Sequence, residues 1–211
     1  MSTSQTRLDI RIDVFEKEDQ WAKPLSSLKP ADLISSIFQE FRELEYLSGN
    51  PDDYFLVNKE DAAPLDPDES LKRQVSNNAH LVLQEQEHPI PPGTKPLSNP
   101  VYLREQTSGK VYKLHWMPSV IGRPDSNQVH DDWLAVNLET YPTGLRVSRR
   151  HAQITEENGR YYIKSLSNNP TVIKDDYGND KPIGDTPTPL ANNDVFFLER
   201  SNISLKFIIR E

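Results

Sequence analysis

The chain has 211 residues, no cysteine and a formal net charge of −8. Residues 1–87 contain 9 Lys and Arg against 18 Asp and Glu, whereas residues 88–211 contain 15 against 14. This balance argues against a nucleic-acid partner, and the lack of cysteine excludes disulfides and a thiol nucleophile. No apolar run is long enough to cross a membrane, so we expect a soluble, cytoplasmic protein without membrane insertion.

The first 87 residues predict strands arranged around one helix. Residues 8–15 alternate between apolar and polar side chains, which predicts a strand with one buried face, and a short strand is expected near 21–25. Pro30 suits the first turn of a helix, and apolar residues at helical spacing extend that helix to Leu47, just before the stop signal at 48–51. Further strands are predicted at 54–57 and 80–84, with a short helical piece near 65–71 between them.

This order of elements resembles that of ubiquitin-like β-grasp domains. The resemblance is carried by three short runs: 54–57, 64–67 with Leu71, and 81–83. It implies that residues 1–87 form an α+β β-grasp domain that docks a further protein partner. Because this part of the chain is acidic, we expect the partner to present Lys and Arg.

Residues 88–100 contain five prolines among 13 residues. Proline fixes φ and removes the amide donor, so no regular element is expected there. The segment is predicted to be an extended, Pro-rich linker between two domains.

Residues 101–211 carry many short strand patterns separated by turns. Strands predicted at 153–155 and 161–163 are joined by Asn158-Gly159, a dipeptide typical of tight hairpins. Residues 124–147 are predicted to be mostly loop. The other strands are expected at 101–103, 111–114, 119–121, 195–198 and 205–209. Such a series predicts a β-sandwich and makes the whole chain mainly β.

Three polar blocks follow these strands in a fixed order. They are Gly122-Arg123, then Ser148-x-x-His151, then Asn169-x-Thr171. Together they resemble the forkhead-associated (FHA) domain, a phosphothreonine-peptide-binding β-sandwich, over residues 101–211. The sequence departs from the family pattern in a long loop before Ser148, in Pro170 where the family usually has Gly, and in a third block that is one residue short.

The resemblance implies a role for each residue near these blocks. Arg123, Ser148 and Arg149 would contact the phosphate, and Arg146 would help to select the third residue after the phosphothreonine. One of Asn168 and Asn169 would hold the peptide backbone while the other lies near the phosphate, and which does which stays open. Gly122 and His151 would be structural, with His151 bracing the binding loop.

The residues themselves leave other functions open. A guanidinium pairs two phosphate oxygens, but a surface Arg also forms ordinary salt bridges. Ser148 could be a turn residue, or a nucleophile with His151, although no Gly-x-Ser-x-Gly elbow surrounds it. No His or acidic group stands at metal-ligand spacing, so we predict no catalytic residue, no metal and no cofactor.

The sequence therefore predicts a recognition protein and not an enzyme. The expected function is a phosphothreonine-dependent adaptor or scaffold in Ser/Thr kinase signalling, whose ligand is a phosphorylated protein made by such a kinase. The alternative is a phosphate-independent FHA-like subunit of a larger machine, such as a secretion apparatus.

Overall fold

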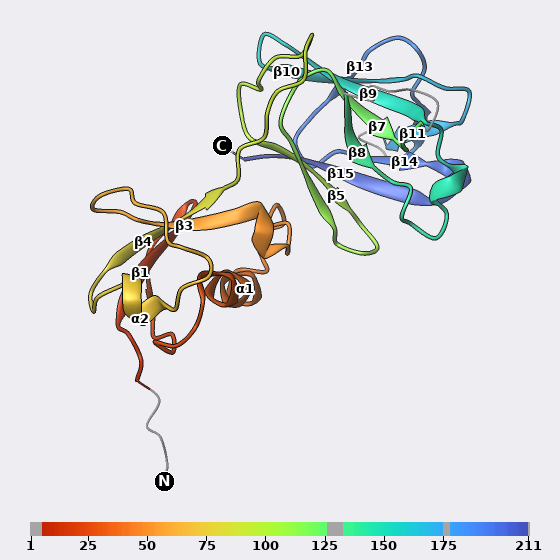
Figure 1. The fold of residues 1–211 in the computed structure, drawn as a ribbon. Coiled ribbons are helices and arrows are strands. Elements are labelled where there is room, and N and C mark those ends of the chain that lie inside the picture. The colour runs from red at the N-terminus through yellow and green to blue at the C-terminus, as the bar shows by residue number, and fades with distance from the viewer. Residues whose placement is uncertain (1–5, 126–132, 175–177, 211) are drawn as a thin grey trace. The chain divides into compact units, whose positions relative to one another are not determined.

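The computed structural model describes residues 6–125, 133–174 and 178–210. The chain divides into two compact units, Met1–Glu87 and His88–Glu211 (Figure 1). Strands dominate both units, as the pattern predicts.

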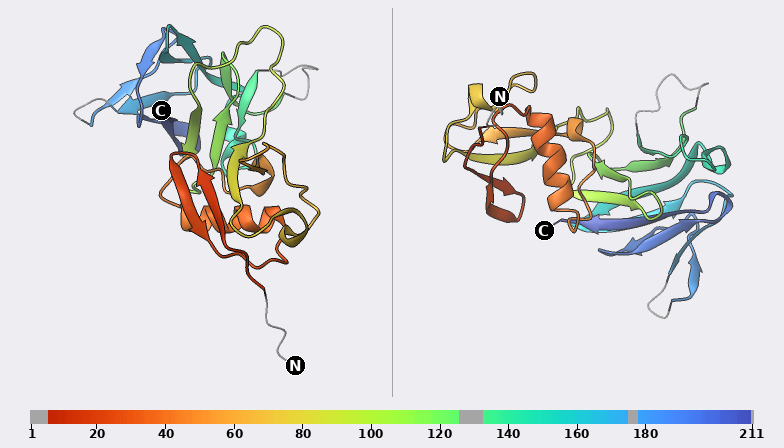
Figure 2. Two further views of the ribbon diagram at one scale, coloured as in Figure 1. Left: turned by 90° about the vertical axis from the view of Figure 1, so that its left-hand side faces the viewer. Right: turned by 90° about the horizontal axis from the view of Figure 1, so that it is seen from below.

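The first unit is a mixed four-stranded sheet with one helix lying across it (Figures 1 and 2). The strand order is β2-β1-β4-β3, with β1 parallel to β4 and the other neighbours antiparallel. Its elements are β1 (Ile10–Val14), β2 (Lys17–Ala22), α1 (Pro30–Glu40), η1 (Pro51–Asp53), β3 (Tyr54–Asn58), α2 (Leu71–Gln74) and β4 (His80–Glu85). The predicted order of elements is therefore found, while kinship with ubiquitin-like domains stays a prediction.

Helix α1 is shorter than the sequence predicts. It ends at Glu40, and the chain continues in turns in which the Leu44 amide donates to the Phe41 carbonyl and the Leu47 amide donates to the Leu44 carbonyl. Apolar residues three apart satisfy such i to i+3 turns as well as a helix, so the spacing alone could not separate the two. The second strand also begins earlier than expected, at Lys17.

A buried carboxylate links the strands of the first unit. Asp13 on β1 accepts hydrogen bonds from the Asp19 amide at 2.8 Å and from Lys59 Nζ at 2.7 Å, and its Oδ1 lies 2.7 Å from His80 Nε2. Ligating atoms of Asp13, Asp19 and His80 lie within 4.8 Å of one another, but Lys59 and Arg11 already pair with these carboxylates. The group is accordingly a neutralised structural network.

The second unit is a sandwich of two sheets (Figures 1 and 2). The first sheet has the order β13-β10-β9-β7-β8 and the second β12-β11-β14-β15-β5-β6. Its strands are β5 (Val101–Glu105), β6 (Val111–Leu114), β7 (Ser119–Gly122), β8 (Leu134–Asn137), β9 (Arg150–Glu157), β10 (Arg160–Ser165), β11 (Thr171–Lys174), β12 (Asp180–Pro182), β13 (Thr188–Leu190), β14 (Val195–Leu198) and β15 (Ile203–Ile209). Two short 3₁₀ helices, η2 (Gly144–Arg146) and η3 (Glu199–Ser201), lie between strands.

The core of the second unit lies between its sheets, where Ile121, Ile154, Phe196 and Phe207 are fully buried. Removal of this apolar surface from water is the main stabilising term. The predicted hairpin is present, and Asn158 and Gly159 have φ of 52° and 73°.

Residues 124–147 contain more structure than predicted. They include β8 and η2, and β8 pairs parallel with β7. Strands that pair in parallel are not joined by a hairpin turn, so the sequence around β8 carries no turn signal. This explains why the sequence pattern missed the strand.

The Pro-rich segment contacts the second unit. The amide of Lys95 donates to the Met117 carbonyl at 2.9 Å, and the Met117 amide donates back at 2.8 Å. The Ser98 amide donates to the Glu156 carboxylate at 3.1 Å, and the Trp133 indole donates to the Pro92 carbonyl at 3.2 Å. These bonds hold the Pro-rich segment against the sandwich. The segment therefore packs on the second unit and is not the extended spacer that the sequence predicts.

Within the described ranges, none of the helices is long and apolar enough to span a membrane.

The Asp13 network generates a stability prediction. Burial alone would raise the pKa of Asp13, but hydrogen bonds from Lys59, the Asp19 amide and His80 together lower it to about 2. The carboxylate therefore stabilises the fold above its unfolded pKa of about 3.9, and this contribution is lost as pH falls toward 2. Asp13→Asn should destabilise the first unit by about 1–3 kcal/mol at neutral pH, because one acceptor oxygen becomes an amide NH2 that faces the surrounding donors and the negative charge that pairs with Lys59 is lost.

Hydrogen exchange of the β1 and β4 amides measures this effect within the first unit. Glu60→Gln, at an exposed acid of the same unit, is the control and should leave exchange unchanged. Equal protection of β1 in Asp13→Asn and wild type would show that the network does not stabilise the sheet.

Candidate functional site

The three polar blocks meet at one end of the sandwich. Strands β7, β9 and β10 are antiparallel neighbours, with Gly122 opposite Arg150 and Ser165 opposite Ala152. The end of β7, the start of β9 and the end of β10 therefore lie at the same end of the sheet. The loops that follow or precede these strand ends carry the predicted site residues.

Gly122 allows two backbones to approach closely. A Cβ added at this position would lie 2.0 Å from the Arg149 carbonyl oxygen and 2.9 Å from that of Ser148. No other residue could occupy the position without moving the loop before β9. The close contact between the two backbones is thus the physical reason for the structural role predicted for Gly122.

Arg123 is held by backbone atoms of that loop. Its amide donates to the Arg149 carbonyl at 3.1 Å, and its Nε donates to the Val147 carbonyl at 2.9 Å. The side chain is half-buried. With Nε engaged, the loop sets the plane of the guanidinium, and within the described parts of the chain no further hydrogen bond of this side chain is found.

Ser148 lies beside Asn169 from the loop between β10 and β11. Asn169 Nδ2 donates to Ser148 Oγ at 2.8 Å and to the Arg146 carbonyl at 3.3 Å. Asn168 is exposed, and no hydrogen bond of its side chain is found within the described parts of the chain. The structure thus brings Asn169, and not Asn168, to the serine.

His151 lies beneath the loop and is 1% exposed. Its Nδ1 accepts from the Ser148 amide at 3.3 Å, and its Nε2 lies 3.0 Å from Thr171 Oγ1. Since Nδ1 accepts, the neutral ring carries its proton on Nε2 and donates it to the threonine. Burial lowers the pKa of His151 to about 4.

This geometry separates His151 from the serine hydroxyl. The imidazole bonds the amide of Ser148, while Ser148 Oγ bonds Asn169. A serine nucleophile needs its hydroxyl hydrogen-bonded to a base, and this pairing is not formed here. The ring is positioned to orient the loop.

Two further arginines lie on the same rim. Arg149 Nε lies 3.4 Å from Asp125 Oδ1, an ion pair in which the Arg149 side chain is 47% exposed and the Asp125 side chain 15%. Arg146 is exposed and follows Leu145, an apolar side chain that is 74% exposed. The rim therefore combines cationic groups with one apolar contact surface.

Sequence reasoning missed two contributors to this region. Asp125 partners Arg149, and Thr171 supports His151, although in the sequence Thr171 stands out only as part of the third polar block. A pocket of about 510 Å³, lined by 165–170 and 183–185, adjoins Asn169. Residues 183–185 are brought there by the fold, because the Ser165 amide donates to the Gly184 carbonyl at 2.6 Å.

Comparison with known proteins identifies part of this unit. Residues 119–198 match the family model described as FHA domain. The second unit therefore contains an FHA domain, within the range that the three blocks predict. The comparison with curated proteins found no match.

Solved structures similar to this chain include three that carry FHA domains or phosphopeptides. The FHA domain of human APLF in complex with an XRCC1 bisphospho peptide is 23% identical, with TM-score 0.38, over 52% of this chain and 97% of that one. The FhaA FHA domain complexed with the intracellular domain of Rv3910 is 25% identical, with TM-score 0.38, over 51% and 98%. Mycobacterium tuberculosis EmbR in complex with a low affinity phosphopeptide is 24% identical, with TM-score 0.39, over 53% of this chain and 24% of that one.

Burial of His151 generates a prediction about pH and stability. The folded ring stays neutral down to about pH 4, whereas an unfolded histidine takes up a proton near 6.5. Between these values the unfolded state binds more protons, so stability should fall as pH falls from 6.5 to 4. His151→Ala should be less stable than wild type by about 1–3 kcal/mol at pH 7, since the Ser148 amide and Thr171 lose their partner, and its pH dependence in this window should be flatter.

Urea unfolding at a series of pH values provides the measurement. His88→Asn, at an exposed histidine, is the control and should keep the wild-type dependence. A His151→Ala protein as stable as wild type would contradict the bracing role.

Proposed function

We propose that this protein is a phosphothreonine-dependent protein-binding adaptor or scaffold in Ser/Thr kinase signalling. The observation that carries the proposal is the convergence of Arg123, Ser148 and Asn169 at one end of a sandwich that contains an FHA domain. These groups come from three loops that are far apart in the sequence. Their side chains offer a guanidinium, a hydroxyl and an amide toward one ligand.

The donor chemistry fits a phosphate monoester. Phosphate carries about −1.5 to −2 charges at pH 7 and three acceptor oxygens. The terminal nitrogens of Arg123 can pair two of these oxygens, because Nε already bonds Val147 and fixes the plane of the guanidinium. Ser148 Oγ accepts from Asn169, so its own proton is available for a third oxygen.

Arg149 supplies a second cation that is partly neutralised by Asp125. A bound phosphate would compete with this carboxylate for the guanidinium. The charge-assisted bonds would favour the dianion, which supplies more acceptors than one carboxylate oxygen at 3.4 Å. Arg149 therefore contributes to phosphate affinity after its ion pair rearranges.

Asn169 is the residue we propose to hold the peptide main chain. An amide side chain both donates and accepts, as a peptide backbone requires. Asn168, exposed at the rim, would lie beside the bound peptide and line the pocket formed by 165–170 and 183–185.

The first unit completes the adaptor in this proposal. Its mixed sheet and crossing helix suit a ubiquitin-like β-grasp domain, which would dock a second protein while the sandwich recognises the phosphorylated one. In the alternative, phosphate-independent assembly role, the sandwich would bind a partner protein that carries no phosphate. Phosphate dependence decides between the two.

Removal of Arg123 tests the central claim. Arg123→Ala should weaken binding of a phosphothreonine peptide by about 2–5 kcal/mol, the range for truncating one partner of a hydrogen-bonded charge pair. Arg123→Lys should recover only part of this loss, since an ammonium cannot form the planar fork. Titration calorimetry with peptides selected from an oriented phosphopeptide library provides the measurement.

The matched control is Arg160→Ala, at an exposed arginine at the opposite end of β10, which should bind like wild type. One peptide should be used in phosphothreonine, phosphoserine and unmodified forms. By resemblance to FHA domains, the threonine methyl should matter, so the phosphoserine and unmodified forms should bind far more weakly. Equal affinity for the unmodified and phosphothreonine forms of the peptide would favour the phosphate-independent role.

The rim position of Arg146 predicts a sequence preference. Its exposed guanidinium should favour an acidic residue near the third position after the phosphothreonine. In the same oriented library, Arg146→Glu should shift the preference at that position toward Lys or Arg, while Arg160→Ala leaves it unchanged. An unaltered preference in Arg146→Glu would remove this role and leave the phosphate site intact.

A further inference from the structure

The pocket beside Asn169 lies between the β10–β11 loop and the β12–β13 loop, and its volume is about 510 Å³. Backbone hydrogen bonds fix the second of these loops to the neighbouring strands. The Ser165 amide donates to the Gly184 carbonyl at 2.6 Å. The Ile183 amide donates to the Thr171 carbonyl at 2.8 Å. This Asn169 pocket therefore has a shape that the fold sets before any ligand enters.

The lining of this pocket is mainly polar but includes an apolar part. Leu166, Pro170 and Ile183 supply the apolar part, and Ile183 is buried. Asn168 and Asp185 are exposed and supply polar side chains where the pocket opens to solvent. A ligand group that suits this lining is apolar along its length and polar at its end.

The charge of the pocket has one sign. Among the described residues that line it, only Asp185 is charged. Its Oδ1 accepts a hydrogen bond from Thr186 Oγ1 at 3.5 Å, a distance at the weak limit for such a bond. Within the described ranges, no Lys, Arg or His pairs with this carboxylate. The carboxylate therefore keeps acceptor sites for a cationic group of a ligand.

Asn169 connects this pocket to the cationic rim of the phosphate site. Its Nδ2 donates to Ser148 Oγ at 2.8 Å and to the Arg146 carbonyl at 3.3 Å. Because Asn169 also lines the pocket, a peptide held by this residue meets cations toward Arg146 and a carboxylate toward Asp185. Like charges are unfavourable across an interface, so a basic residue of such a peptide is directed to the pocket.

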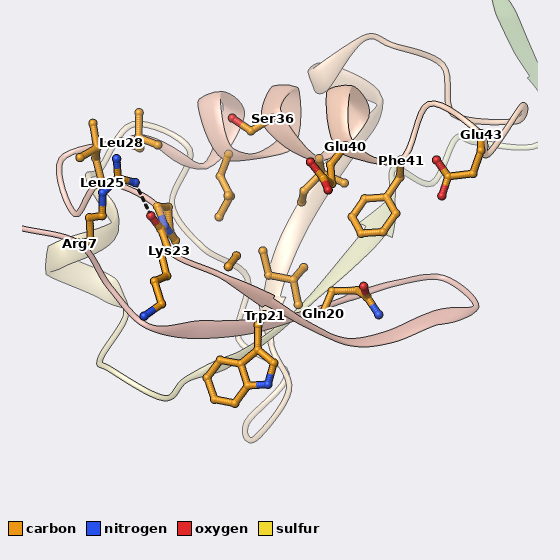
Figure 3. Close-up of a pocket in the computed structure, with 15 residues that line it drawn as sticks. Arg7, Gln20, Trp21, Lys23, Leu25, Leu28, Ser36, Glu40, Phe41 and Glu43 are labelled. Atoms are coloured by element: carbon orange, nitrogen blue, oxygen red, sulfur yellow. Dashed lines mark hydrogen bonds between the residues drawn. The ribbon is translucent and has the colours of Figure 1, made fainter.

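The larger groove of the first unit lacks this selectivity for charge. It lies between β2 and α1 and has a volume of about 610 Å³ (Figure 3). Arg7 and Lys23 line it together with Glu40 and Glu43, so its charged residues have both signs. Such a lining favours no single ligand charge. The Asn169 pocket, with one carboxylate and no cation in its described lining, favours a cation.

A lysine or arginine side chain matches the Asn169 pocket. Its methylene stem can lie along Leu166 and Ile183 while its cationic head reaches Asp185 at the opening. An arginine can also pair both carboxylate oxygens through its planar fork. An acidic side chain would meet a like charge, and an apolar one would displace water from the carboxylate without replacing its hydrogen bonds.

We propose that the Asn169 pocket is a specificity subsite of the phosphopeptide site, which takes a Lys or Arg side chain of the bound peptide and pairs it with Asp185. This inference rests on the proposed phosphothreonine function, because the residue that we assign to the peptide main chain also lines the pocket. The phosphorylated partner would then carry a basic residue at one fixed position near its phosphothreonine. Asp185 is the specificity-determining residue, and it lies outside the three polar blocks.

Selection from an oriented phosphothreonine library tests this subsite on the full chain. Wild type should select Lys or Arg at one position, and Asp185→Asn should lose that selection. Asp185→Lys should select Asp or Glu at the same position, because the charge of the pocket is reversed. Glu157→Lys, at an exposed acid at the far end of β9, is the control for a general change in charge and should keep the wild-type selection.

Titration of one selected peptide separates the subsite from the phosphate contact. Replacing its basic residue by Met should weaken binding to wild type about three- to fivefold, the size of effect expected for a partly exposed ion pair. The same replacement should change binding to Asp185→Asn little, because the carboxylate is already gone. The difference between the two peptides on wild type should shrink as salt rises.

Failure of the subsite and failure of the proposed function give different results. Equal binding of the unmodified and phosphothreonine peptides, or wild-type binding by Arg123→Ala, would overturn the phosphothreonine function and the subsite with it. The subsite alone is overturned when binding still requires both the phosphate and Arg123 but the library shows no basic position. It is also overturned when a basic position keeps its preference in Asp185→Lys.

Discussion

The close approach of the chain at Gly122 to the loop before β9 is the constraint on which the proposed phosphate site depends. A side chain at Gly122 would lie 2.0 Å from the Arg149 carbonyl oxygen, so only glycine allows the two backbones to meet. This contact brings the carbonyls of Val147 and Arg149 within reach of Arg123, which bonds both. The guanidinium is thereby oriented before any ligand arrives, and pre-organised groups lose less conformational entropy on binding.

Charge in this unit is divided between a neutral interior and a cationic rim. His151 is kept neutral by burial and bonds the Ser148 amide and Thr171, so the support beneath the loop carries no charge that would need a counter-ion. The arginines stand at the surface, where water solvates them until a ligand replaces it. This arrangement lets the site attract an anion without the cost of a buried, unpaired cation.

The sequence predicted much of this fold because its local signals agree with the tertiary structure. Asn158-Gly159 forms the expected turn, and the strand predicted at 119–121 is present and ends just before Arg123. What it could not predict depends on contacts between distant segments. Asn169, and not Asn168, contacts Ser148 because of the way the loops pack. Helix α1 ends at Glu40 although apolar residues continue beyond it at a spacing that turns satisfy as well as a helix does. The Asp125 partner of Arg149 is likewise an ordinary loop acid in the sequence.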